Sequence, residues 1–283
     1  MTYGLMIQTA FYLPSPLLRP YVHHYWILQT RDMSTSHTVM PMESLKWIFH
    51  RKRPFDVNGQ PDLHTKASVC GQYKAAIHIE SSEALEVIMV FFQPYAARLV
   101  MNAPCTEFAN ANIDFDLLEN PAFSELKRQV LEADTHANCI SYIERFLLRQ
   151  LIRTQDSPYL QPLEHVFRQM TASAGEVRVE ALADAACLSE RQFRRIFADY
   201  VGMTPKQMLC VRRFHQAANA LMQQEEASFD SLLCRLGYTD HSHFNREFHR
   251  LAGMSPTDFV HHLEDVNRQG CLTAYRSYHC SDE

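Results

Sequence analysis

Three arginines, Arg191, Arg194 and Arg195, lie close together in one short stretch of this chain. Apolar residues recur around them at helical spacing, at positions i, i+3, i+4 and i+7: Phe193, Ile196, Phe197 and Tyr200. If this stripe faces a core, a helix of about 3.6 residues per turn points Arg191 and Arg195 outward and leaves Arg194 on the flank. Guanidinium groups bond guanine bidentately in the major groove of DNA. A short helix that offers three of them has the form of a major-groove reader.

The residues on either side predict where this helix begins and ends. Ser189 is a typical N-cap, and Gln192, three residues later, completes a capping box. Gly202 is the expected stop, and Thr204 followed by Pro205 reads as the cap and first position of a new helix. A leading helix before Ser189 completes the layout of a helix-turn-helix.

The chain contains this pattern twice, 51 residues apart. The offset maps Phe193 onto Phe244 and Phe197 onto Phe248. Four further pairs follow the same offset: Gly202 and Gly253, Pro205 and Pro256, Leu182 and Leu233, and the caps Ser189 and Asp240. Such a fixed period indicates a duplicated supersecondary unit. A long helix over 205–224 is predicted to join the two copies and to set their separation.

Two segment pairs carry a resemblance to a known family. They are ALADAACLSERQFRRIF with VGMTPKQML, and LLCRLGYTDHSHFNREF with LAGMSPTDFV. Both resemble the tandem helix-turn-helix domain of the AraC/XylS family of bacterial transcription regulators, and two linked copies make this match more specific than one. The resemblance implies a DNA-binding domain over residues 160–270 whose two reading helices enter successive major grooves on one face of the duplex.

The resemblance also implies which side chains touch DNA. Base-facing positions are Arg191, Arg194 and Arg195 in the first copy and His241, Ser242, Asn245 and Arg246 in the second. Phosphate contacts are expected from Lys206, Arg212 and Arg213 and from the hydroxyls of Thr204 and Ser255. Arg212 and Arg213 have an alternative, which is to pair with nearby acidic residues. The alternative without a function is that all these residues form an ordinary solvated polar surface.

Composition sets the limits of the whole molecule. The 283 residues are 46% hydrophobic and 21% charged, as in a globular protein of about two domains. No long apolar run and no signal peptide are visible, so we expect no membrane contact and a cytoplasmic location. The net charge is −5, and residues 160–270 hold 12 basic against 14 acidic side chains, so we expect modest non-specific DNA affinity.

Residues 1–155 predict a different kind of domain. Short apolar or alternating runs separated by turn signals dominate to about residue 93: YVHHYWILQ, SLKWIFH, ASVC, AIHIE and EVIMVFF. They favour a β-sandwich or small barrel, and helical spacing follows from about residue 121. The predicted fold class is therefore α+β, with a barrel- or sandwich-like domain and trailing helices before the all-α domain. The segments 12–26, 41–44 and 91–104 resemble the sensory domain of one branch of the same family.

The function of this first domain stays open between alternatives. An aromatic effector pocket is one, for which the candidates are Tyr25, Trp26, Trp47, Phe49 and Phe91, although such residues at strand period are more often plain core. Purely protein-protein contact, including a homodimer through the trailing helices, is another. A metalloenzyme is the third, but His78 and Glu80, which share a strand face, lack a second ligand pair, so we expect no metal, no cofactor and no catalytic residue.

Partners follow from the same reasoning. Double-stranded DNA is expected, and RNA polymerase is expected as well if the regulator is an activator. The eight scattered cysteines read as small buried thiols, with nothing in the sequence that marks Cys70, Cys105 or Cys139 as reactive. The tail over residues 271–283 shows no periodicity, and no role follows from it.

Overall fold

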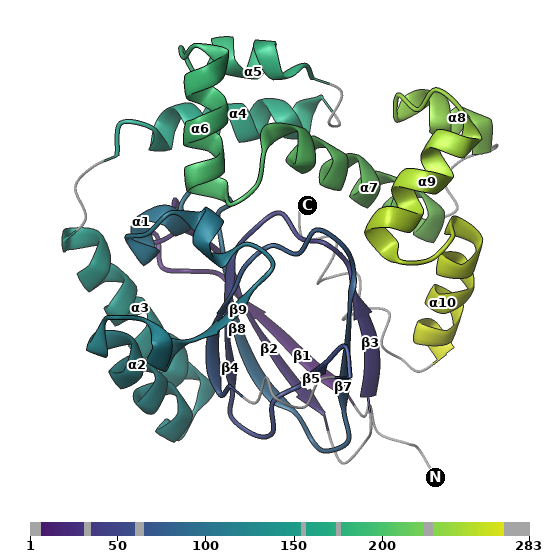
Figure 1. Cartoon of the computed structure of the whole chain (residues 1–283). Coiled ribbons are helices and arrows are strands. Elements are labelled where there is room, and N and C mark those ends of the chain that lie inside the picture. The colour runs from purple at the N-terminus through teal and green to yellow at the C-terminus, as the bar shows by residue number, and fades with distance from the viewer. Residues whose placement is uncertain are drawn as a thin grey trace.

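The fold comes from a computed structural model of the chain, which describes residues 7–30, 35–59, 65–153, 157–173, 177–223 and 229–268. Figure 1 shows a β-rich domain beside two groups of helices. The tail over residues 271–283 lies outside the described residues. The predicted α+β class is confirmed, with strands first and the helix-turn-helix units last.

Within the described residues, nine strands form two antiparallel sheets. The larger sheet has the order β1-β2-β8-β4-β6-β9, and the smaller has the order β3-β7-β5. The sheets stay separate in this part of the chain, so the domain is sandwich-like rather than a closed barrel. The strand bounds are β1 Ile7–Tyr12, β2 Val22–Thr30, β3 Thr35–Val39, β4 Lys46–His50, β5 Asp56–Val57, β6 Ala67–Cys70, β7 Ile77–Ser81, β8 Glu86–Phe92 and β9 Asn112–Asp114.

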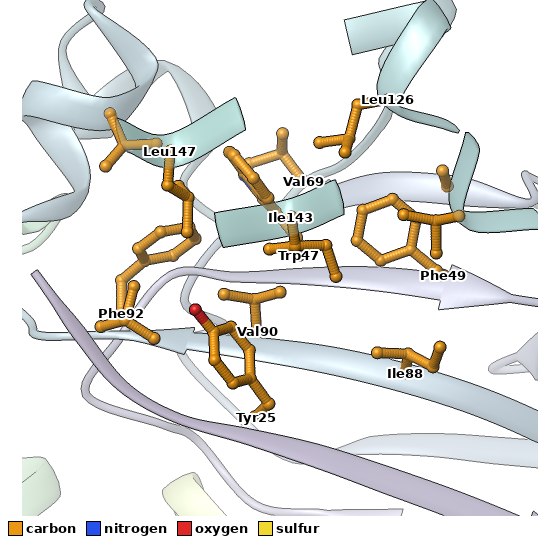
Figure 2. Packing of buried hydrophobic residues seen from close by; sticks show 14 of the residues in the cluster. Tyr25, Trp47, Phe49, Val69, Ile88, Val90, Phe92, Leu126, Ile143 and Leu147 are labelled. Atoms are coloured by element: carbon orange, nitrogen blue, oxygen red, sulfur yellow. The ribbon is translucent and has the colours of Figure 1, made fainter. Parts of the chain in front are cut away.

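The central strands of the larger sheet are buried on both faces. Their residues are mostly apolar, as in EVIMVFF of β8, although β4, KWIFH, also buries the polar Lys46 and His50. Tyr25 pairs with Val90, and Val90 pairs with Trp47, so these three residues line one face across three strands. That face packs against helices, as Figure 2 shows for Leu126, Ile143 and Leu147.

The opposite face of the sheet carries a second cluster. Trp26, Ile48 and Met89 lie on it, and Phe55, which precedes β5, packs against them. Because successive residues of a strand point to opposite faces, adjacent residues such as Tyr25 and Trp26 belong to different clusters.

Short helices follow β8 and cover the first face. They are α1 Ala97–Met101, η1 Cys105–Phe108, η2 Phe115–Leu117, α2 Pro121–Glu132 and α3 His136–Arg153. The predicted apolar stripe of α3 packs within the chain, because Ile143 and Leu147 are fully buried against the sheet. Ile152, at the end of α3, is 85% exposed.

The remaining helices form the predicted all-α domain. Their bounds are α4 Leu160–Ala172, α5 Val179–Ala185, α6 Glu190–Val201, α7 Pro205–Gln223, α8 Phe229–Arg235, α9 His241–Ala252 and α10 Pro256–Arg268. Figure 1 shows α7 running from the group of α4, α5 and α6 to the group of α8, α9 and α10. None of the described helices is long and apolar enough to cross a membrane.

One strand of the larger sheet is irregular. Adjacent residues on a regular strand point to opposite faces, which would keep the rings of His23 and His24 apart. The pairing of β2 with β8 shifts register between Val22 and His24, and this irregularity turns the two rings together. Their Nδ1 atoms lie 2.6 Å apart.

Candidate nucleic-acid interface

The first reading helix, α6, begins and ends where the sequence predicts. The Ser189 side chain accepts from the Gln192 backbone while the Gln192 side chain accepts from the Ser189 backbone, which is the predicted capping box. Gly202 ends the helix in the left-handed conformation, with φ +88°. These caps fix both ends of α6 and therefore which of its side chains face the core and which face solvent.

The buried face of α6 leaves the three arginines outside. Phe193, Ile196, Phe197 and Tyr200 are buried, and Arg191, Arg194 and Arg195 are exposed. The Arg194 Nε donates to Glu190 on the same helix, at 2.7 Å. Within the described residues, Arg191 and Arg195 form no hydrogen bond or ion pair, so their guanidinium groups are available to a partner.

The second reading helix, α9, repeats this arrangement. The Asp240 carboxylate accepts from the backbone of His243 at 2.7 Å, and Phe244 and Phe248 are buried. The predicted base-facing residues of this copy, His241, Ser242, Asn245 and Arg246, are all exposed. His241 is engaged with Asp230 of α8 at 2.6 Å.

The exposed face of α9 extends further than the sequence-based interpretation proposed. His249 and Arg250 are also exposed, in the last turn of the helix. Arg250 lies four residues after Arg246, so helical spacing alone places the two on one face. That spacing was the signal by which Arg250 could have been found.

The turn before the reading helix differs between the two units, so the 51-residue offset does not hold along the whole unit. In the first unit Cys187 takes the left-handed conformation and donates to Asp184, and Leu188 donates to Ala183. In the second unit Gly237 and Tyr238 make the corresponding bonds to Cys234 and Leu233, at an offset of 50 residues.

Because the caps Ser189 and Asp240 are 51 residues apart, the second turn is one residue longer. Leu182 therefore corresponds to Leu232, not to Leu233 as predicted. The sequence concealed this difference because Leu232 and Leu233 are adjacent, apolar and both buried.

The predicted phosphate-contacting residues fall into two groups. Lys206 is exposed in the first turn of α7. Thr204 accepts from the backbone of Gln207, and Ser255 from that of Asp258, so both hydroxyls cap helices α7 and α10.

Arg212 and Arg213 take the alternative of pairing with acids. The Arg212 Nη2 lies 2.6 Å from Glu43 of the N-terminal domain, and this arginine is only 9% exposed. The Arg213 Nη2 donates to both carboxylate oxygens of Glu247 on α9, at 2.7 and 2.9 Å. Because their guanidinium groups are occupied inside the molecule, neither arginine is placed for the predicted phosphate contact in this arrangement.

Glu247 collects several donors besides Arg213. The Tyr238 hydroxyl donates to it at 2.9 Å, and the Arg213 guanidinium lies 4.6 Å from the centre of the Tyr238 ring. Burial acts to raise the pKa of Glu247, but the hydrogen bonds and charge of Arg213, with Tyr238, outweigh it and hold the pKa below its usual value. A charged, partly buried pair thus connects α7 to the second reading helix.

The N-terminal domain holds both units. Arg98 of α1 pairs with Asp199 of α6 at 3.3 Å, and the Gln72 side chain donates to the Val201 carbonyl at the end of that helix. The Ala76 backbone donates to the Leu251 carbonyl at 2.7 Å, and Met40 lies in the apolar core of the second unit. The reading helices are therefore positioned by the first domain as well as by α7.

The predicted effector candidates are dispersed. Tyr25, Trp47 and Phe49 are fully buried in the cluster between the sheet and α2 and α3 (Figure 2). There Trp47 packs edge-on against Phe92 and Phe115. Trp26 and Phe91 lie in the cluster on the opposite face. The five side chains therefore do not surround one pocket, because the alternation of the strands divides them between two faces.

Metal ligands and reactive thiols were also sought in the described part of the chain. There, no three His, Cys, Asp or Glu side chains lie close enough together to hold a metal ion. His78 and Glu80 share a face as predicted and bond to each other at 2.9 Å. Burial raises the pKa of the Cys70, Cys105 and Cys139 thiols, which makes the nucleophilic thiolate scarce.

Comparison with known proteins adds to this geometry. Residues 182–262 match a family described as a helix-turn-helix domain, and residues 10–114 match a domain of unknown function (DUF6597). The transcriptional activator RhaS of Shigella boydii is 36% identical over 85 residues, which is 30% of each chain. The activator RhaR of Enterobacter sp. is 28% identical over 153 residues, 50% of this chain and 53% of RhaR.

The matched part of the chain thus spans only 30% of the length of RhaS and 53% of that of RhaR. Among solved structures, ToxT of Vibrio cholerae is 10% identical with a TM-score of 0.44, over 90% of this chain and 98% of ToxT. Residues 182–262, which match the helix-turn-helix family, contain both capped reading helices and the linking helix between them. Residues 182–262 therefore form a helix-turn-helix domain of the AraC/XylS type, the family that the sequence resembles.

Proposed function

We propose that this protein is a sequence-specific DNA-binding regulator of transcription that inserts α6 and α9 into two successive major grooves. The observation that carries the proposal is the pair of capped helices whose apolar faces are buried and whose polar faces are exposed. On α6, Arg191 and Arg195 have no competing partner within the described residues, so they are the first candidates for base contacts.

The linking helix supports the use of both readers. α7 has 19 residues and is therefore about 28 Å long, close to the roughly 34 Å that separate equivalent major-groove positions on one face of the duplex. The Arg213–Glu247 pair ties α9 to α7 and so restricts the angle between them. Lys206 supplies a phosphate contact at the start of α7, where the helix dipole favours an anion.

A selection of bound sequences from randomised duplexes tests the proposal. Two conserved half-sites centred about one helical turn apart are expected in the selected DNA. Binding without any enriched sequence would leave only non-specific electrostatic attraction and would contradict the proposal.

The Arg195→Ala variant tests base reading directly. Losing a bidentate contact to guanine costs about 1–3 kcal/mol of discrimination at one base position. Titration of matched and singly substituted duplexes measures this loss. The Lys206→Ala variant is the control, since loss of a phosphate contact weakens binding to all sequences alike and lowers the salt dependence by about one counterion. An equal loss on every sequence for Arg195→Ala would assign that residue to phosphate.

Partners and location follow from the same proposal. RhaS and RhaR are named transcriptional activators, and for an activator RNA polymerase is the expected protein partner. Such a regulator works in the bacterial cytoplasm, where its DNA lies. The activity proposed is binding rather than catalysis.

Two alternatives remain for the role of the N-terminal domain. In one it responds to a small molecule, and in the other it makes only protein contacts. The contacts of Glu43, Gln72 and Ala76 with the helix-turn-helix units favour direct control of the readers by this domain.

A further inference from the structure

The two reading helices share one register but do not carry the same side chains. α6 and α9 each have 12 residues, and each ends at a left-handed glycine. Their caps are Ser189 and Asp240, so within the helices an offset of 51 residues relates every position of α6 to one of α9. A side chain of α6 and its counterpart on α9 therefore reach equivalent places in their own grooves.

An arginine occupies the sixth position after the cap in both helices. Arg195 on α6 and Arg246 on α9 are both exposed, and neither forms a hydrogen bond or an ion pair within the described residues. A guanidinium group that is available in this way can bond O6 and N7 of guanine. The shared arginine thus predicts one guanine at the equivalent place in each half-site.

One turn before the shared arginine, the two helices differ. Arg191 lies four residues before Arg195, whereas its counterpart on α9 is Ser242. Residues four apart are separated by about 6 Å along a helix, and bases of one strand by roughly 3.4 Å, so Arg191 reaches a base about two pairs away. A serine hydroxyl both donates and accepts, so it selects no single base. A second guanine is therefore expected only in the half-site of α6.

The position just before the shared arginine differs as well. On α6 it is Arg194, whose Nε and Nη2 both bond the same oxygen of Glu190, the Nε at 2.7 Å. A guanidinium group holds guanine with two N–H groups, so the bonds to Glu190 compete with base contact. On α9 the counterpart is Asn245, which is exposed and makes no hydrogen bond within the described part of the chain. An asparagine amide bonds N6 and N7 of adenine, so adenine is expected only in the half-site of α9.

The last turns of the two helices add to this difference. Asp199 of α6 is paired with Arg98 of the N-terminal domain, at 3.3 Å. Its counterpart on α9 is the exposed Arg250, which lies on the same face as Arg246. Phosphates attract an arginine and repel a carboxylate, so α9 contacts the DNA backbone over one more turn than α6 does.

We propose that the DNA site consists of two unlike half-sites that share one guanine. The half-site of α6 has a second guanine about two base pairs away, which Arg191 reads. The half-site of α9 has an adenine close to the shared guanine, which Asn245 reads, and a phosphate contact from Arg250. Because the half-sites differ, one chain binds the duplex in one orientation only. This assignment rests on the proposed function and adds the bases that each helix selects.

Selection from randomised duplexes, run in parallel on the natural chain and its variants, tests the assignment. The natural chain should enrich one half-site with two guanines and another with one guanine and one adenine. Asn245→Ala should relax the preference for adenine about tenfold and leave the guanines unchanged. Arg194→Ala, at the equivalent position of α6, is the matched control and should relax no base.

Ser242→Arg is the sharper test, because a gain is expected. The added guanidinium group should impose a second guanine on the half-site of α9, with a preference of about tenfold over the other bases. Arg250→Ala should instead weaken binding to every sequence alike and lower the salt dependence by about one counterion. All four substituted side chains are exposed, so these variants remove no packing from the core.

The outcomes separate this assignment from the proposed function. Two enriched half-sites with the same bases, a base preference lost in Arg194→Ala, or a Ser242→Arg variant that selects no additional guanine would each overturn the assignment and leave sequence-specific binding intact. Selected DNA without any enriched sequence would overturn the proposed function and the assignment together.

Discussion

At the scale of single residues, the backbone of Cys187 is unusual. Its φ is +54°, while the other non-glycine residues with positive φ in the described chain are all asparagine, which tolerates this conformation. A left-handed residue with a Cβ costs about 1–2 kcal/mol, and glycine avoids this cost but loses more entropy on folding. The corresponding position of the second unit is Gly237, with φ +66°.

We therefore expect Cys187→Gly to stabilise the protein by up to about 1 kcal/mol, because strain at the first turn is relieved. Urea unfolding measures the change. Gly237→Ala is the reciprocal control and should destabilise by a similar amount or more. A less stable Cys187→Gly variant would show that the thiol side chain makes a contact worth more than the strain.

Residue identity predicted some of the interface but not the direction of each side chain. Arg195 could be placed outside because its own helix supplies the apolar stripe that orients it. Arg212 could not, because its partner, Glu43, lies far earlier in the chain and no local pattern connects the two. Long-range pairing of this kind is invisible to helical spacing.

At the scale of elements, the Arg213–Glu247 pair holds α9 against α7. A carboxyl whose pKa is lowered in the folded state stabilises the fold above its unfolded pKa of about 4.3, and this contribution is lost as pH falls through the folded pKa. We expect Glu247→Gln to be less stable than the natural protein near pH 7, with the difference shrinking towards pH 3. Urea unfolding over this pH range measures the difference.

The control for that series is Glu190→Gln, which breaks the exposed pair with Arg194 on α6. Exposed pairs contribute only about 0–1 kcal/mol, so its effect should be small at every pH. A constant deficit in Glu247→Gln across the pH range would assign its effect to packing rather than to charge.

Elements with their own local signals were predicted well. The capping box of α6, the Asp240 cap of α9 and the glycine stops are confirmed, as are the five apolar strands. Strands β1, β3, β5 and β9 were missed. All four lie at sheet edges, β5 has only two residues, and the TSHTV of β3 offers little apolar alternation.

At the scale of the whole molecule, the N-terminal domain contacts both helix-turn-helix units. A side chain at Gly202 would place its Cβ 2.9 Å from the Cys105 carbonyl oxygen, whereas among the described residues nothing lies within 4 Å of one at Gly253. The two glycines end equivalent helices, yet only the first is pressed against the N-terminal domain. The sequence shows the glycine stops but not this close approach.

The contact between Met40 and the second unit gives a test of this arrangement. Met40 is 2% exposed within the apolar core of that unit. Truncating a buried methionine costs about 2–5 kcal/mol, so Met40→Ala should open this contact more often. We expect the Ala76 amide, which donates to Leu251, to exchange with solvent at least about tenfold faster.

Amides in β4 and β8 serve as the internal control and should keep their protection, because these strands lie in the centre of the larger sheet. Unchanged exchange at Ala76 would mean that other contacts hold the second unit in place.

The additional residue in the second turn has a consequence for protein engineering. Thr239 lies between the left-handed Gly237 and the cap Asp240, with no counterpart between Cys187 and Ser189. The two helix-turn-helix units therefore cannot be exchanged residue for residue. A chimera that exchanges the readers by a uniform shift would displace either the leading helix or the recognition helix by one position, about 100° of rotation, and turn its polar face towards the protein.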